Sequence, residues 1–181
     1  LATTSPTIPF SIVAISSDTG TRGSDFNTKP AAQTLTGTLS AAMASDDILK
    51  VSVNAGCSYS AVTSDVTGSP DAALSTSVTV SGSSSINLQI TDDAGNAGTA
   101  DTTSYTLDTT APTITFASVD ISADTGTSSS DFNTKTAAQT LTGTLSAAMA
   151  SDDILKVSVN AGSSYSDVTS DVTGNPDTAL S

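Results

Sequence analysis

The sequence predicts an all-β fold, and three observations predict it. Ser and Thr are abundant throughout the 181 residues, a composition that favours strands and turns. Runs of the strong helix formers are absent, and the chain contains no Glu. Short segments of alternating apolar and polar residues recur between clusters of Gly, Pro, Asn and Asp, as in strands joined by turns.

The chain is also a tandem repeat. The opening LATTSPT returns as LDTTAPT at 107–113, and at this offset of 106 residues the segments 1–75 and 107–181 are identical at 61 of 75 positions. A unit of this length can bury one core. We therefore expect a complete repeat over 1–107 and a partial second repeat over 108–181, joined at Asp108–Pro112. Pro112 restricts its own φ and the conformation of Ala111, so this joint is expected to be stiff.

The second repeat has no counterpart of the segment 76–106. It is therefore expected to lack roughly its last three strands, and it could not close a sandwich alone. Two interpretations follow. The segment is a fragment of a longer protein, or another chain supplies the missing strands, as in donor-strand and swapped assemblies.

Apolar alternation marks the expected strands of the first repeat. In the first strand, Ile8 to Ser16, the apolar phase changes between Ile12 and Val13, which predicts a bulge or kink. The next two strands are expected at 33–40 and 48–53. Their inward residues are expected to be Leu35, Gly37, Leu39, Leu49, Val51 and Val53. Further strands are expected at 59–63, around 78–80, at 86–90 and up to 107.

Turn signals separate these strands. Residues 17–30 are expected to form a long loop, repeated at 123–136, and 41–47 and 64–73 are further connections. Asn54-Ala55-Gly56 is a hairpin turn in which Gly supplies a positive φ, and TDDAGNAG at 91–98 is a tight acidic turn. About seven short strands in about a hundred residues predict tandem immunoglobulin-like β-sandwiches, the second one incomplete. The Trp and the Cys pair typical of such a core are absent.

The charge is strongly negative. The net charge is −13, with 18 acidic residues against 5 basic ones, and every acid is Asp. Asp hydrogen-bonds its own loop backbone, so these carboxylates are expected in loops. Two carboxylates about 4 Å apart repel by about 4 kcal/mol at an effective dielectric constant of about 20. A hard divalent cation would remove this repulsion, and outside a cell that cation is Ca²⁺.

The loops are expected to gather the candidate ligands at opposite ends of the sandwich. At the end from which the chain leaves for the next repeat are Asp18, Asp25, Asn27 and Asp108. At the entering end are Asp46, Asp47, Asp92, Asp93 and Asn96. The copies in the second repeat are Asp124, Asp131, Asn133, Asp152 and Asp153. A Ca²⁺ ion shared between the leaving end of one repeat and Asp152 and Asp153 of the next would lock the two at a fixed angle.

A simpler interpretation of each Asp is a turn former, and a solvated acidic surface would also explain the net charge. No stretch has the EF-hand spacing. The scarcity of Lys and Arg disfavours nucleic-acid binding, and no apolar run approaches the length of a membrane span. Without His or Glu, acid–base and nucleophilic catalysis lack their usual residues, so no enzyme is expected. Cys57 is replaced by Ser163 in the second copy, so neither a disulfide nor a catalytic thiol belongs to the repeat.

Four stretches resemble a known family along the whole chain. They are DTTAPT at the joint, DTGTSSSDFNT after the first strand, LTGTLSA, and TDDAGN before the last strand. They are similar to the immunoglobulin-like extender repeats of large bacterial adhesins of the repeats-in-toxin class, exported by type I secretion, including the extension region of a marine ice-binding adhesin. The resemblance implies tandem sandwiches stiffened by Ca²⁺ at and near the linkers, which project adhesion domains from the cell. The ligands that it implies are Asp92, Asp93, Asn96, Asp108, Asp124, Asp131 and Asn133.

The resemblance also has departures. Ala2 stands at the position of Asp108 in the first copy, so an ion before the first repeat would lack this ligand. The acidic DDAGN turn has no copy in the second repeat, so a site at the joint that used it would be incomplete.

Two functions are therefore considered. The first is an extracellular, cell-surface structural spacer whose ligand is Ca²⁺ and whose partners are neighbouring repeats of the same chain. The second is a module that binds ice or a glycan through exposed threonine rows. These rows are Thr34, Thr36 and Thr38 and their copies Thr140, Thr142 and Thr144. Thr is an ordinary exposed strand residue, so the spacer is the function expected.

Overall fold

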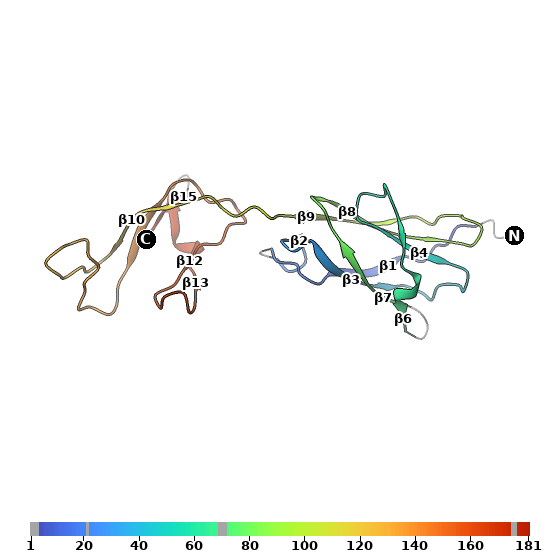
Figure 1. The fold of residues 1–181 in the computed structure, drawn as a ribbon, viewed down its shortest axis with the longest axis horizontal. Coiled ribbons are helices and arrows are strands. Elements are labelled where there is room, and N and C mark those ends of the chain that lie inside the picture. The colour runs from blue at the N-terminus through green and yellow to red at the C-terminus, as the bar shows by residue number, and fades with distance from the viewer. Residues whose placement is uncertain (1–3, 21, 69–71, 175–176) are drawn as a thin grey trace. The chain divides into compact units, whose positions relative to one another are not determined.

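The computed structural model describes the chain except for residues 1–3, 21, 69–71 and 175–176 (Figure 1). The fold is all-β, as predicted: apart from two short 3₁₀ turns, the regular elements of the described residues are strands. The chain divides into two compact units, Leu1–Thr110 and Ala111–Ser181. The boundary expected from the sequence lies a few residues earlier, after Leu107. In the described part of the chain, no helix is long and apolar enough to cross a lipid bilayer.

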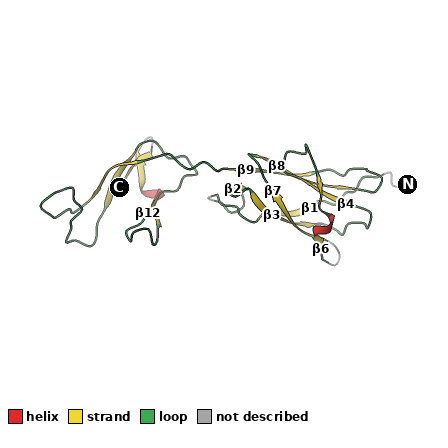
Figure 2. Ribbon diagram, viewed as in Figure 1, coloured by secondary structure: helices red, strands yellow, loops and turns green. Residues whose placement is uncertain are grey.

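Two sheets form the first unit (Figures 1 and 2). The strand order of the first sheet is β1 (Phe10–Ile15), β3 (Ala32–Leu39), β7 (Ala73–Thr79) and β6 (Val66–Thr67). The strand order of the second is β2 (Asn27–Thr28), β9 (Asp101–Leu107), β8 (Ser84–Thr91), β4 (Ile48–Ser52) and β5 (Ser60–Ala61). Neighbouring strands are antiparallel except β2 and β9, which run parallel. A 3₁₀ turn, η1 (Thr63–Asp65), lies between β5 and β6.

The core of the first unit lies between these two sheets. Leu35 of the first sheet and Leu49 and Leu88 of the second are at most 1 % exposed, and they belong to one apolar cluster. The inward residues expected for β3 and β4 are confirmed, although Gly37 and Val53 are only partly buried. Because alternate residues of both sheets meet in one core, the unit is a β-sandwich.

β1 carries the predicted bulge. Phe10 pairs with Leu39, but Ile12 pairs with Thr38, so β1 has one extra residue between these pairs. The shift lets both Phe10 and Val13 pack against the core, although three positions separate them. β1 stays in the first sheet along its whole length, and the chain reaches the second sheet only at β2.

The structure adds two short strands to segments that were predicted as loops. β6 lies within 64–73 and pairs with β7, and β2 lies within 17–30 and pairs with β9. Each has only two residues, too few for an alternation to show in the sequence. Pro70 and Asp71 of the predicted 64–73 loop lie outside the described residues. The predicted Asn54–Gly56 turn is confirmed, with φ of 57° at Ala55 and 80° at Gly56.

The second unit repeats part of this sandwich. Its larger sheet has the order β10 (Phe116–Ile121), β11 (Leu141–Leu145), β15 (Asp177–Leu180) and β14 (Val172–Gly174). A two-stranded sheet contains β12 (Lys156–Val157) and β13 (Ser166–Asp167), and η2 (Thr169–Asp171) matches η1. At the offset of 106 residues these strands correspond to β1, β3, β7, β6, β4 and β5. No described strand of this unit corresponds to β8 or β9.

Candidate cation-binding loops

The loop at 17–30 leads from β1 to β3, includes the short strand β2, and folds tightly around the predicted ligands Asp18 and Asn27. The backbone amides of Thr19 and Gly20 donate to the Asn27 carbonyl oxygen at 2.9 and 3.0 Å. Asp18 Oδ2 accepts a hydrogen bond from the Phe26 amide at 2.9 Å. Phe26 has a φ of 59°, in the left-handed region that non-glycine residues seldom adopt. The side chain of Asp18 thus holds a strained turn in place.

The other oxygen of Asp18 has no partner. Oδ1 is buried and makes no hydrogen bond, and the same is true of Oδ1 in Asp124, the equivalent residue of the second unit. Among the described residues these are the only buried side-chain oxygens or nitrogens in this situation. Leaving a buried polar group unsatisfied costs about 1–3 kcal/mol, and more if it is charged. A cation would supply the missing partner, so the residues present fit one.

The second unit builds the same loop. Asp124 Oδ2 accepts from the Phe132 amide at 2.9 Å, and Phe132 again has a φ of 59°. Asp131 Oδ1 accepts from the Asn133 amide at 3.0 Å, the distance found for the equivalent pair in the first unit. No described strand of this unit stands in the place of β9 beside the loop, yet the loop keeps its geometry. The arrangement is therefore local to the DTG…SDFNT sequence.

Gly20 makes room for the carboxylate of Asp25. A Cβ atom on Gly20 would lie 3.0 Å from Asp25 Oδ1, closer than side chains normally tolerate. At Gly126 a Cβ atom would lie 3.2 Å from Asp131 Oδ1. Asp25 and Asp131 are exposed. In each unit the glycine therefore allows a second carboxylate to fold over the loop that contains the orphaned oxygen.

Gln33 anchors both ends of this loop, a role that the sequence did not reveal. Its side chain is 4 % exposed. Oε1 accepts from the Ser17 amide at 2.9 Å, and Nε2 donates to the Pro30 carbonyl oxygen at 2.6 Å and to Thr28 Oγ1 at 2.7 Å. Gln139 makes the equivalent contacts in the second unit. A signal was present, because Gln33 occupies the inward phase of β3, where an apolar residue is expected.

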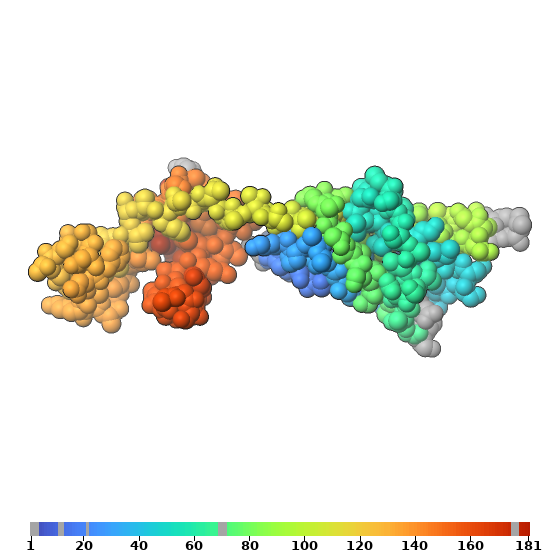
Figure 3. All heavy atoms as spheres, in the orientation of Figure 1, coloured from blue at the N-terminus to red at the C-terminus, as the bar shows by residue number. Residues whose placement is uncertain are grey.

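Asp108 lies at the same end of the first unit as this loop. Its amide donates to the Thr28 carbonyl oxygen at 2.9 Å. Figure 3 shows atoms of the loop, in blue, gathered near the end of β9. Asp108 is exposed, and its Oδ1 accepts from the Thr110 amide at 2.9 Å, as in a turn former. The approach of Asp152 and Asp153 to this end stays a prediction.

At the other end of the first unit, Asp92 closes the acidic turn after β8. Ile48 pairs with Thr91, which places Asp92 beside the start of β4. Asp92 is 6 % exposed, and its Oδ1 and Oδ2 accept from the backbone and side-chain amides of Asn96, both at 2.7 Å. The side-chain hydrogen bond from Asn96, with weaker backbone ones, lowers the pKa of Asp92 below its ordinary value. Both carboxylate oxygens therefore already have partners.

Asp47 and Asp153 form turns in the 41–47 loop and in its copy. Asp47 Oδ2 accepts from the Ala44 amide at 3.1 Å, and Asp153 Oδ2 accepts from the Ala150 amide at 2.9 Å. Three further predicted ligands are exposed to solvent: Asp46, Asp93 and Asp152. Within the described ranges, no three acidic, His or Cys side chains come together as a metal centre. The turn-former interpretation fits this end, and the loops at 17–30 and 123–136 are the better cation candidates.

The predicted threonine row lies on β3, in the interior of the first sheet. Thr36 is exposed, and Thr34 is half-buried. Thr36 pairs with Ser75 and Thr34 with Ser77 on β7, so hydroxyl groups extend across two strands. Their copies in the second unit are exposed at Thr140, Thr142 and Thr144.

Comparison with protein-family models, with curated proteins and with solved structures found no match to this chain. The two repeats can, however, be compared with each other. The features that recur at equivalent positions are the loop with the orphaned carboxylate oxygen, the anchoring glutamine and the turn in the 41–47 loop.

Proposed function

We propose that the chain is a structural spacer of a cell-surface adhesin, made of tandem immunoglobulin-like repeats that bind Ca²⁺ in their loops. The strand orders β1-β3-β7-β6 and β9-β8-β4-β5 support this, because they are the orders expected of such a sandwich. Tandem repeats joined by a segment that contains Pro112 suit a module that serves to extend the protein. The observation that carries the proposal is the buried, partnerless Oδ1 of Asp18, which recurs in Asp124.

The loop at 17–30 and its copy would hold the ion. A bound Ca²⁺ ion would take oxygen ligands from the loop, and its positive charge would neutralise the neighbouring carboxylates. Asp18 contributes an oxygen that has no other partner, and Asp25 is held over the same loop. No three acidic side chains converge among the described residues, so neutral oxygens would complete the shell. The Asn27 side chain and loop carbonyl groups are of the type that Ca²⁺ accepts.

The neighbouring repeat is the proposed partner, and the cell exterior is the proposed location. Asp108 begins the joint at the end where the loop lies, so an ion that also used Asp108 would tie the joint to the sandwich. Extracellular modules bind Ca²⁺ with dissociation constants of about 10⁻⁴–10⁻³ M, a range that suits a stiffening ion outside the cell. Catalysis forms no part of the proposal, because the sequence contains neither His nor Glu.

The test compares Asp18→Asn with the wild-type chain, each with chelator and with Ca²⁺. In chelator, Asn keeps an oxygen for the Phe26 amide and removes the carboxylate oxygen that has no partner, so we expect the first unit to melt at the same or a higher temperature than wild type. Ca²⁺ at about ten times its dissociation constant should add about 1.4 kcal/mol to the wild-type free energy of unfolding, and this gain should disappear in Asp18→Asn.

The matched control is Asp93→Asn, which removes an exposed carboxylate at the other end of the unit. It should retain the full gain from Ca²⁺. Identical wild-type melting curves in chelator and in millimolar Ca²⁺ would count against the proposal, as would an undiminished gain in Asp18→Asn.

A second candidate function rests on the hydroxyl row of β3 and β7, which presents Thr36 beside Ser75 on an exposed face. Such a row would bind ice or a glycan. Replacing Thr36 and Thr142 with Tyr would disrupt the row in both units. If the chain is a spacer, the variant and the wild-type chain should show the same thermal hysteresis and the same glycan binding. Loss of either activity in the variant would favour the second function.

A further inference from the structure

A network of buried polar side chains lies at the base of the loop at 17–30. Gln33 and Thr28 form it, and both are at most 4 % exposed. Gln33 Nε2 donates to Thr28 Oγ1 at 2.7 Å, and Thr28 Oγ1 donates to the Ser17 carbonyl oxygen at 2.6 Å. Gln33 Oε1 accepts from the Ser17 amide at 2.9 Å. The two side chains therefore hold both the N–H and the C=O group of Ser17.

These contacts fall next to the predicted ligands. Ser17 directly precedes Asp18, and Thr28 directly follows Asn27. The network therefore cross-links the loop beside two ligands that are nine positions apart in the sequence. Residues 22–25, between the two ligands, are exposed, so packing does not order them. Without the cross-link, an ion that brought the two ligands together would have to overcome the conformational entropy of the loop.

The second unit keeps the network although both ends of its loop differ in sequence. The residues at the positions of Ser17 and Pro30 are Ala123 and Thr136. Gln139 Oε1 accepts from the Ala123 amide at 2.8 Å, and Nε2 donates to the Thr136 carbonyl oxygen at 2.6 Å. Nε2 also donates to the hydroxyl group equivalent to that of Thr28, at 3.0 Å. The substitutions leave the network intact because the glutamine contacts backbone groups at both positions.

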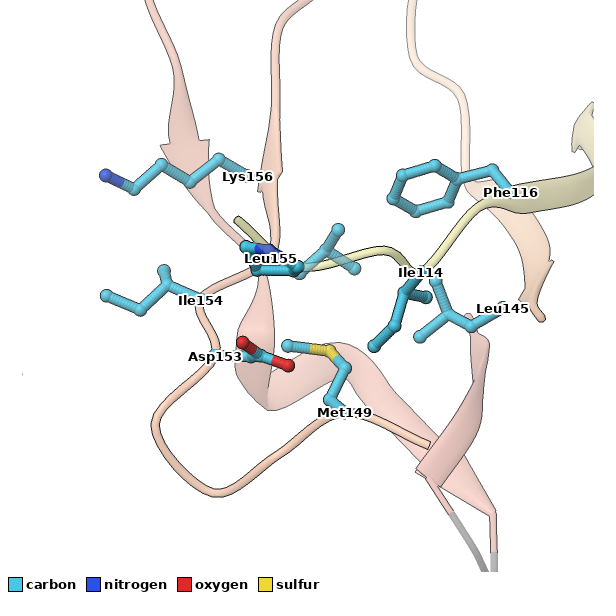
Figure 4. A pocket seen from close by; sticks show the side chains of 9 residues that line it. Ile114, Phe116, Leu145, Met149, Asp153, Ile154, Leu155 and Lys156 are labelled. Carbon is cyan, nitrogen blue, oxygen red and sulfur yellow. The ribbon is translucent and has the colours of Figure 1, made fainter. Parts of the chain in front are cut away.

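Not every predicted ligand has such a network. Asp153 lies at a cavity of about 290 Å³ in the second unit, beside Ile114, Met149 and Leu155 (Figure 4). Apart from Asp153 and Lys156, the described lining of this cavity is apolar, without an amide or hydroxyl side chain. The buried amide–hydroxyl network thus accompanies the two loops in which a carboxylate oxygen is orphaned.

We propose that Gln33 and Thr28 are positioning residues of the Ca²⁺ site, which hold Asp18 and Asn27 in place in the ion-free chain. The equivalent pair does the same in the loop at 123–136. The inference rests on the proposed function, and neither side chain needs to contact the ion. Replacing residues that orient metal ligands commonly lowers metal affinity by about 10–100-fold. Loss of the network should therefore weaken Ca²⁺ binding even in a chain that stays folded.

Gln33→Met tests this role, because Met has a similar length but neither donates nor strongly accepts hydrogen bonds. The readout is the amide resonances of both loops during a Ca²⁺ titration of the 181-residue chain. We expect the dissociation constant at the loop 17–30 to rise about 10-fold. The loop at 123–136 should keep its wild-type value and serves as an internal control. Thr28→Val, which removes only the hydroxyl group from a side chain of the same shape, should shift the constant in the same direction.

A matched control separates positioning from stability. Leu35→Val trims a buried core side chain on the same strand and removes no hydrogen bond of the network. It should lower the melting temperature of the first unit and leave both dissociation constants unchanged. In chelator, hydrogen exchange of the Phe26 amide, which donates to Asp18 Oδ2, should accelerate in Gln33→Met but not in Leu35→Val. If Gln33→Met does not fold, Gln139→Met provides the same comparison in the second unit.

The titration distinguishes failure of this role from failure of the proposed function. Wild-type loop resonances that do not respond to Ca²⁺ would refute the proposed function and the positioning role with it. A wild-type response with an unchanged dissociation constant in Gln33→Met would refute the positioning role alone. An equal loss of affinity in Leu35→Val would also refute it, because the effect would then follow from stability.

Discussion

A single buried glutamine anchors the loop that contains the orphaned Asp18 oxygen. Gln33→Ala would leave the Ser17 amide and the Pro30 carbonyl oxygen without their partner at a site that is only 4 % exposed. We expect the free energy of unfolding of the first unit to fall by about 2–4 kcal/mol in urea denaturation. Thr36→Ala, at an exposed position of the same strand, should change it by less than about 0.5 kcal/mol. Equal effects of the two substitutions would show that the loop does not depend on Gln33.

Asp92 makes the stability of the first unit depend on pH. Its pKa is lowered by hydrogen bonds from Asn96. A carboxyl group whose pKa is lower in the folded state stabilises the fold above its unfolded pKa of about 3.9, and this contribution is lost as the pH falls through the folded pKa. Wild-type stability should therefore decline below about pH 4, and Asp92→Asn should flatten part of that decline in urea denaturation. A pH profile of Asp92→Asn that is indistinguishable from that of the wild-type chain would refute the assignment.

Among the secondary-structure elements, the longer strands could be predicted from sequence and the shortest could not. β3, β4 and β8 carry apolar alternation, and the phase change in β1 revealed its bulge. β2 and β6 have two residues each and exist because a longer strand lies beside them. The candidate site divides in the same way. Its Asp and Gly residues stand out as a repeated loop, but the contact of Gln33 with Ser17, 16 positions earlier, is tertiary.

The two copies of one strand provide a matched pair for measuring how β8 and β9 complete the core. Leu35 on β3 is 0 % exposed, whereas its equivalent Leu141 on β11 is half-buried. Leu35→Ala should lower the free energy of unfolding of the first unit by about 2–5 kcal/mol. Leu141→Ala should cost the second unit about 1–2 kcal/mol, because less apolar surface is lost from contact. Equal losses of unfolding free energy for the two substitutions, measured by chemical denaturation, would contradict the difference in burial between Leu35 and Leu141.

At the scale of the 181 residues, the two units should differ in stability, because residues equivalent to the buried core of the first unit are more exposed in the second. In chelator we expect two calorimetric transitions, the lower one from the second unit. Leu35→Ala should shift only the upper transition and Leu141→Ala only the lower one. A single cooperative transition, shifted alike by both substitutions, would contradict this independence.

Ca²⁺ then distinguishes ions held within each loop from an ion shared across the joint. Ions held only by the loops at 17–30 and 123–136 would raise the temperatures of both transitions and keep the transitions separate, because each ion adds binding free energy to its own unit. An ion shared between Asp108 and the Asp152 and Asp153 pair would link the folded state of one unit to that of the next, so the difference between the two transition temperatures should narrow. Asp108→Asn should restore the gap while both transitions still rise with Ca²⁺. A gap that is unchanged by Ca²⁺ in the wild-type chain would confine the ions to the separate loops and leave Pro112 as the source of any stiffness in the joint.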